Sequence, residues 1–128
     1  MVAAQVYYRQ LAEGRCDQFL AAKMGADSLP QGYREQLVAC YKQFVAQQKR
    51  AHKGIADVTA TRAEMDSAAN EMQVFLMLNY GDSTREEIVV PMVAQRGSWL
   101  MKSRLVLVPM LSVFIILLVY SCHFLVFF

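Results

Sequence analysis

Residues 31–78 read "QGYREQLVACYKQFVAQQKRAHKGIADVTATRAEMDSAANEMQVFLML", and this stretch decides the fold. Nearly every residue in it is compatible with a helix, and Gly54 is the one helix breaker in its interior. At ~1.5 Å per residue such a helix would be about 72 Å long, more than a small domain can cover. The stretch therefore predicts a long helix that bends near Gly54 or lies against partner proteins.

The chain before this stretch predicts a first helix that folds back on the long one. Between Val2 and Met24 apolar residues recur at helical spacing, with Gly14 as a weak point. The segment "GADSLP" at 25–30 predicts a turn, because Gly suits a helix C-terminus and Pro suits the first turn of the next helix. We therefore expect residues 1–80 to form an antiparallel helical hairpin with its turn near residues 25–30.

The chain after the hairpin predicts a connector and a membrane anchor. Gly and Pro residues interrupt 81–98, which is expected to be a connector with a short helix. Residues 105–128 contain no Asp, Glu, Lys or Arg, and as a helix of about 36 Å they could cross the hydrocarbon core of a bilayer. We expect residues 99–128 to form a juxtamembrane segment and one C-terminal transmembrane helix. The predicted fold class is all-α.

The charges beside the apolar run predict an orientation. Arg96, Lys102 and Arg104 precede the run, and the positive-inside tendency places the N-terminal part on the matrix or cytosolic side. The start of the chain lacks the apolar core of a secretory signal and has acidic residues that suit a transit peptide poorly. We expect an integral membrane protein of the mitochondrial inner membrane, without a cleaved leader.

Side chains that suit lipid headgroups lie at both ends of the apolar run. Trp99, Lys102 and Arg104 lie at its start, and Tyr120 and His123 lie near its far end. An ionisable residue inside a membrane often has a function. His123, however, would lie about 28 Å beyond Arg104, at the far interface, where anchoring is favoured over a haem or quinone role. We expect these five residues to anchor the span, with lipids bound around it.

Two cysteines lie at equal distances from the expected turn. A hairpin would bring Cys16 and Cys40 opposite one another, where a disulfide forms if the Cα atoms come within ~7 Å. A disulfide requires an oxidising compartment, which conflicts with the expected orientation. The alternative is a pair of buried free thiols, since free Cys packs as a small hydrophobe. Both alternatives stay open, and the free thiols are favoured.

The charged and metal-binding residues exclude several classes of function. Thirteen Lys and Arg against 11 Asp and Glu give a net charge of +2, too balanced to indicate nucleic-acid binding. The sequence has no nucleophile-elbow, P-loop, dinucleotide or zinc-protease motif. His52 and Cys122 have no companion at metal-ligand spacing. We expect no catalytic site, no metal, no cofactor of its own and no small-molecule substrate, and therefore no enzyme.

Apolar residues between residues 37 and 76 also recur at heptad spacing. Two registers can be traced, and Arg62 lies near the middle of one of them. A heptad seam with a central Arg, followed by a C-terminal anchor, resembles the layout of an arginine-type SNARE. The resemblance implies a coiled coil at 37–76 that pairs with other helices in membrane fusion. The alternative function is therefore a SNARE-like or other tail-anchored fusion or adaptor protein.

The favoured function is structural. The long helix presents more surface than the chain can cover, and the apolar content of 55% comes without a pocket-forming motif. We expect a non-catalytic accessory subunit of a multi-subunit membrane complex, such as a respiratory assembly of the mitochondrial inner membrane, that braces neighbouring subunits. The residues expected to pack against these partners are Tyr7, Tyr8, Phe19, Tyr41, Phe44, Pro109 and Ser112.

Overall fold

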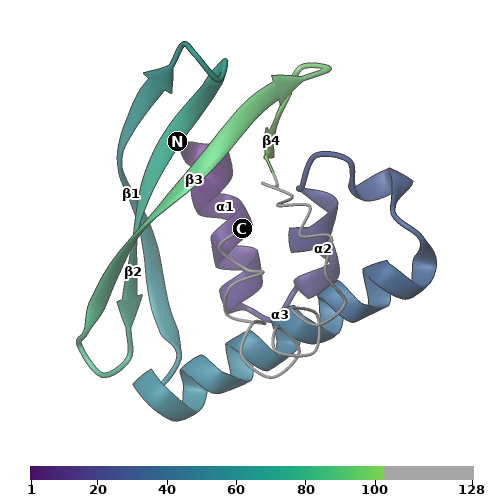
Figure 1. The fold of residues 1–128 in the computed structure, drawn as a ribbon. Coiled ribbons are helices and arrows are strands. Elements are labelled where there is room, and N and C mark those ends of the chain that lie inside the picture. Colours follow the sequence, from purple (N-terminus) through teal and green to yellow (C-terminus); the bar gives the residue numbers. More distant parts are fainter. Residues whose placement is uncertain (103–128) are drawn as a thin grey trace, which may run out of the picture.

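The computed structural model describes residues 1–102, in which helices come first along the chain and strands follow (Figure 1). The elements are α1 (Val2–Ala12), α2 (Cys16–Ala21), the 3-10 helix η1 (Ala26–Ser28), α3 (Gln31–His52), β1 (Ile55–Asp66), β2 (Glu71–Tyr80), β3 (Arg85–Gln95) and β4 (Ser98–Met101). The fold is therefore mixed α/β. The prediction of an all-α protein is wrong.

The strands form one antiparallel sheet in the order β1-β2-β3-β4, so each strand pairs with its neighbour in sequence. Short turns connect them, and Asn70, Ser83 and Arg96 in these turns adopt positive φ angles, as tight hairpin turns require. The pairing of β1 with β2 is irregular between Ala60 and Arg62. Such a bulge increases the local twist of a sheet.

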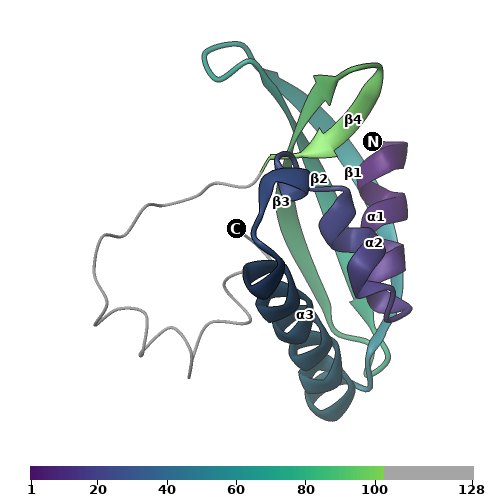
Figure 2. The same cartoon turned by 90° about the vertical axis from the view of Figure 1, so that its right-hand side faces the viewer.

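The helices lie on one face of the sheet (Figures 1 and 2). The rings of Tyr8, Phe19 and Tyr41 meet edge to face, with centroid distances of 5.1 Å for both pairs. Phe19, Tyr41 and Phe44 are at most 1% exposed, and they share one core with buried strand residues such as Leu76. This aromatic cluster joins α1, α2 and α3 into a single layer.

The last strand is tied back to the helices. The Met101 N–H donates to the Ala22 carbonyl oxygen (2.9 Å), and the Met24 N–H donates to the Met101 carbonyl oxygen (2.8 Å). The Tyr7 hydroxyl donates to the Trp99 carbonyl oxygen (2.7 Å). These bonds use the outer side of β4, which as a sheet edge would otherwise expose unpaired backbone groups.

The long helix ends at His52, because the backbone reverses its handedness there. Lys53 (φ 60°) and Gly54 (φ 82°) both lie in the left-handed region, and the Gly54 N–H donates to the Gln48 carbonyl oxygen (2.9 Å). A left-handed residue after the last turn is a common helix stop, and Gly adopts it without a steric penalty. The chain continues directly into β1 from Ile55.

The region beyond Gly54 forms strands because its pattern also fits a period of two. In β1, Val58 and Ala60 face the helices while Thr59 and Thr61 are exposed, and β-branched residues favour strands. The same alternation of buried and half-exposed residues runs through β2. The predicted helix over 31–78 and the coiled coil at 37–76 are therefore wrong. The SNARE resemblance rests on that spacing, so the structure does not support it.

The N-terminal region is closer to expectation. Gly14 (φ 83°) separates α1 from α2, at the weak point of the single helix predicted between Val2 and Met24. Gly25 (φ 79°) is left-handed, and α3 begins at Gln31 directly after Pro30. The turn near residues 25–30 is thus present, although the two-helix hairpin over residues 1–80 is wrong, since residues 55–80 belong to the sheet.

The predicted connector and anchor are corrected as well. Residues 85–95 and 98–101 form β3 and β4 rather than a connector with a short helix. Within residues 1–102, none of the helices has the length and apolar character needed to cross a membrane. The α/β fold differs from the all-helical fold on which the interpretation as a single-pass protein of the mitochondrial inner membrane was based, and that interpretation is corrected. The apolar run 105–128, on which that interpretation rested, lies outside the described residues.

The turn between β2 and β3 packs closely on the end of α3. The Gly81 N–H donates to the Gly54 carbonyl oxygen (2.9 Å), and a Cβ atom at Gly81 would lie 2.6 Å from the Lys53 carbonyl oxygen. We predict that Gly81→Ala lowers the free energy of unfolding by about 1–3 kcal/mol, measured by urea denaturation.

Gly32→Ala is the matched control. A Cβ atom at Gly32 in α3 meets nothing within 4 Å, so this change should raise the free energy of unfolding by about 0.5–1 kcal/mol through helix propensity. Equal effects of the two substitutions would contradict the close approach at Gly81.

Candidate functional site

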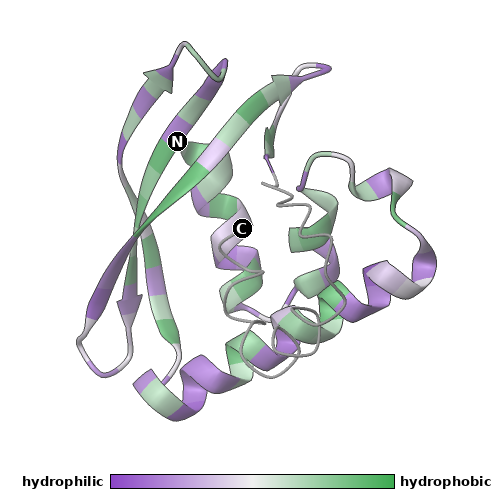
Figure 3. Ribbon diagram, viewed as in Figure 1, coloured by the Kyte–Doolittle hydropathy of each residue, from purple (hydrophilic) through white to green (hydrophobic). Residues whose placement is uncertain are grey.

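The face of the sheet opposite the helices carries a row of apolar side chains. In β2, Val74, Leu76 and Leu78 are buried on the helix side, whereas Phe75 and Met77 between them point to the other face and are half-exposed. Figure 3 shows β3 changing from hydrophilic near its start to hydrophobic further along. We define the outer-face patch as Phe75, Met77, Val89, Pro91, Val93 and Leu100.

The outer-face patch is separate from the core. None of its six residues belongs to the buried cluster or to the half-buried residues packed against it. Neighbouring members lie directly opposite one another across the ladder, as Phe75 does with Val89 and Val93 with Leu100. Val89 is 44% exposed. Contiguous exposed apolar surface on a protein commonly marks an interaction site.

A polar margin borders the patch along β1. The Arg62 guanidinium lies 3.9 Å from the centroid of the Phe75 ring, close enough for a cation–π contact. The same group pairs with Glu64 (Nε to Oε1, 3.5 Å). Thr59 and Thr61 beside them are exposed. An apolar centre with a polar margin is the usual anatomy of a protein–protein interface.

An ion pair between a buried carboxylate and a half-buried lysine lies at another edge of the patch. The Lys102 amine lies 3.1 Å from Glu71 Oε2, and Glu71 is 3% exposed. Gln73 Nε2 donates to Glu71 Oε1 (2.8 Å). The pair links the first residue of β2 to the residue that follows β4. A carboxylate held by two donors is a structural tie, because removing one partner of a buried pair is costly.

A second polar cluster lies where α3 ends. His52 Nδ1 lies 2.9 Å from Asp82 Oδ2, and the imidazole stacks on the Tyr80 ring at a centroid distance of 4.7 Å. The Tyr80 hydroxyl donates to Glu86 Oε2 (2.8 Å), and the Thr84 N–H donates to Asp82 Oδ1 (3.0 Å). Hydrogen bonds from Thr84 and His52 lower the pKa of Asp82 to about 2. We call these residues the His52 cluster.

The His52 cluster has part of the arrangement of a catalytic dyad, because its imidazole lies beside a carboxylate. An imidazole oriented by a carboxylate can act as a general base. Thr84 Oγ1 lies 3.4 Å from His52 Nδ1, the nitrogen that also faces Asp82, so this hydroxyl does not lie at Nε2, where a base oriented by a carboxylate would act. The cluster instead joins the C-terminus of α3 to the β2–β3 turn.

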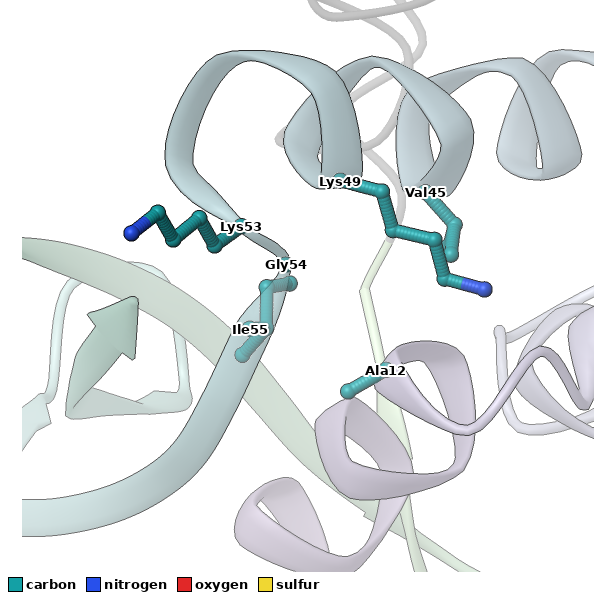
Figure 4. Close-up of a pocket in the computed structure, with 6 residues that line it drawn as sticks. All are labelled: Ala12, Val45, Lys49, Lys53, Gly54 and Ile55. Atoms are coloured by element: carbon teal, nitrogen blue, oxygen red, sulfur yellow. The ribbon is translucent and has the colours of Figure 1, made fainter. Parts of the chain in front are cut away.

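A shallow cavity of about 170 Å³ lies between α1, the end of α3 and the start of β1 (Figure 4). Its lining residues are Ala12, Val45, Lys49, Lys53, Gly54 and Ile55. In Figure 4 the Lys49 and Lys53 amines point away from one another and out of the cavity. The lining has no carboxylate, imidazole or thiol, and its ionisable groups are these two lysine amines, which are not brought together.

The two cysteines that were predicted to lie opposite one another are on neighbouring helices. Cys16 in α2 is buried and Cys40 in α3 is half-buried, and both are free thiols in this structure. Burial raises the pKa of Cys16, which keeps its thiol protonated and unreactive. Within residues 1–102 no group of three or more His, Cys, Asp or Glu side chains that could hold a metal ion occurs.

Most of the predicted partner-packing residues lie inside the protein. Tyr8, Phe19, Tyr41 and Phe44 are at most 4% exposed, so they pack within the chain's own core. Tyr7 is half-buried against β4. These aromatic residues were identified as buried contacts, but the contacts are between elements of one chain.

The predicted membrane-anchoring residues within the described part belong to the end of the sheet. Trp99 lies in β4 and is 42% exposed, and Lys102 pairs with Glu71. Arg104, Pro109, Ser112, Tyr120 and His123 lie outside the described residues.

The outer-face patch was missed because its strands were not recognised. The segment "EEIVVPMV" at 86–93 alternates buried and exposed positions once the strand is known. Val89, Pro91 and Val93 fall on one face by that alternation. Apolar residues on both faces of the strand hid this period, since a continuous apolar run also fits a helix.

The comparisons with known proteins identify the fold only. No family model matches the sequence, and no curated protein is significantly similar to it. The structure resembles the 2.00 Å crystal structure of a protein from Campylobacter jejuni described provisionally as an NTF2-like transpeptidase. The TM-score is 0.60 at 12% identity, over 78% of this chain and 94% of that chain. The fold is thus NTF2-like, and a fold by itself does not separate enzymes from non-enzymes.

The His52 cluster predicts a loss of stability in acid. The folded-state pKa of Asp82, about 2, is below the ordinary ~3.9. The contribution of the Asp82 carboxylate to the stability of the fold is therefore complete above about pH 4 and is lost as the pH falls through 2. We predict that the melting temperature of Asp82→Asn falls less between pH 5 and pH 2 than that of the unmodified protein. Asp27→Asn, at an exposed site, should behave like the unmodified protein, and identical curves for all three would refute the prediction.

Proposed function

We propose that this chain is a non-catalytic accessory module that attaches to a partner protein through the outer-face patch of its sheet. The observation that carries the proposal is the row of six apolar side chains outside the core, which the helices of residues 1–102 leave uncovered. A sheet face of this kind suits a flat partner surface with an apolar centre, such as the face of another sheet.

The arrangement of charges around the patch supports the same partner. Arg62 and Glu64 at the β1 margin pair with one another, and the Glu71–Lys102 pair lies at the other end. Because these charges are already paired within the chain, they limit the cost of desolvation when a partner covers the face. A highly charged partner such as a nucleic acid would find no unpaired basic cluster there.

The absence of an assembled catalytic group among residues 1–102 supports a non-catalytic role. In the His52 cluster the Thr84 hydroxyl lies at Nδ1, the nitrogen that also faces Asp82, rather than at Nε2, and the ionisable groups that line the cavity beside α3 are two lysines whose amines point apart. Catalysis requires groups held at a site that excludes water. The described polar clusters instead stabilise turns and strand ends.

A charged substitution at the centre of the patch tests the proposal. We predict that Val89→Glu weakens the association at least tenfold, because burying a carboxylate in an apolar interface is costly. The measurement is native-gel fractionation of cell extract followed by mass spectrometry, in which the unmodified chain migrates with its partner and the variant does not.

Val6→Glu is the matched control, since Val6 is 41% exposed but lies on α1. It should migrate with the partner like the unmodified chain. Circular dichroism checks that both variants are folded. Unchanged migration of a folded Val89→Glu protein, or loss of the partner in both variants, would contradict the proposal.

A further inference from the structure

A methionine from each strand lies in a single row across the sheet. Met65 of β1 pairs with Met72 of β2, and Met72 pairs with Met92 of β3. Met92 in turn pairs with Met101 of β4. Eight of the 128 residues are methionine, or one in sixteen, so a row of four is far more than the composition predicts. We call these four residues the methionine row.

The methionine row lies on the helix side of the sheet. Met92 and Met101 are 2% and 3% exposed and belong to the core, and the half-buried Met72 packs against it. Met65 is 60% exposed. Since directly paired residues of antiparallel strands share one face of the sheet, the row runs from solvent at Met65 into the core at Met101. A row of this kind has an entrance from solvent and an apolar interior.

Methionine side chains at this spacing can meet at one ion. The Cβ atoms of directly opposed residues lie about 4.5–5.5 Å apart, and a methionine side chain has three rotatable bonds. The sulfurs of three neighbours in the row can therefore converge through side-chain rotation. Thioether sulfur is a ligand for soft cations such as Cu(I), whereas Mg²⁺ and Ca²⁺ require oxygen ligands.

The charged groups beside the row tolerate a cation there. At its buried end Lys23 forms a backbone bridge with Met101, but the Lys23 amine lies against the Phe19 and Tyr41 rings. At the exposed end the next pair of the ladder is Asp66 with Glu71. Lys102 already pairs with Glu71, so Asp66 supplies the negative charge that favours entry of a cation beside Met65.

We propose that the methionine row binds one soft monovalent metal ion, of the class of Cu(I) and Ag(I), through the thioether sulfurs of Met65, Met72 and Met92. A thioether has no proton to lose, so the binding should not depend on pH while the protein is folded. This site lies on the face of the sheet opposite to the outer-face patch and does not depend on the proposed function.

A titration with Ag(I), followed by NMR of the methionine methyl groups in the full chain, tests the proposal. Ag(I) takes the same sulfur ligands as Cu(I) and is not oxidised in air. The titration extends to four equivalents, one more than the three cysteines of the chain can take. We expect the signals of Met65, Met72 and Met92 to shift together in one step of one ion per chain, at both pH 5.5 and pH 7.5. The signal of Met77, on the other face, should stay in place.

A pair of substitutions on β2 assigns the ion to the row. Met72→Leu removes the central sulfur but keeps a side chain of similar volume, so it should abolish the joint shift and lower the number of bound Ag(I) ions by one. Met77→Leu is the matched control and should leave silver binding unchanged.

Three results would overturn the proposal and leave the row as core packing: signals that do not move, signals that move independently of one another, or signals that move together with that of Met77. The titration of the unmodified protein decides this even if Met72→Leu fails to fold.

Discussion

The structure depends on one backbone reversal, at Lys53 and Gly54, where two consecutive left-handed residues end α3 and direct the chain into β1. Backbone hydrogen bonds from the β2–β3 turn hold this point, since the Gly81 and Asp82 N–H groups donate to the Gly54 and His52 carbonyl oxygens. The His52 cluster adds side-chain contacts to the same place. The reversal thus fixes how the helical layer and the sheet are joined.

The sheet that begins there has two unlike faces. Its inner face packs on three helices held together by the Tyr8, Phe19 and Tyr41 rings. Its outer face has apolar side chains that no described element covers, and the ion pair of Glu71 with Lys102 stabilises one end of it. A chain of this size has few helices and strands with which to cover both faces of its sheet, so a partner protein readily explains the exposed apolar area on one face.

The helical half of the fold could be predicted from the sequence, and the sheet could not. The turn at Gly25 and the start of α3 at Gln31 follow from local residue preferences, which the structure obeys. Residues 55–80 satisfy a heptad pattern and a strand pattern at once, and only long-range pairing between β1 and β2 selects the strand. The outer-face patch depends on that pairing, so it was out of reach as well.

Hydroxyl-radical footprinting of the chain, alone and in its native assembly, tests most directly whether the outer face binds the partner. Met77 on the outer face is half-exposed, and Met24 between α2 and η1 is 36% exposed, so each reports on its own side of the molecule. The account predicts that oxidation of Met77 falls several-fold in the assembly while oxidation of Met24 is unchanged. Protection of Met24 with unchanged oxidation of Met77 would contradict it.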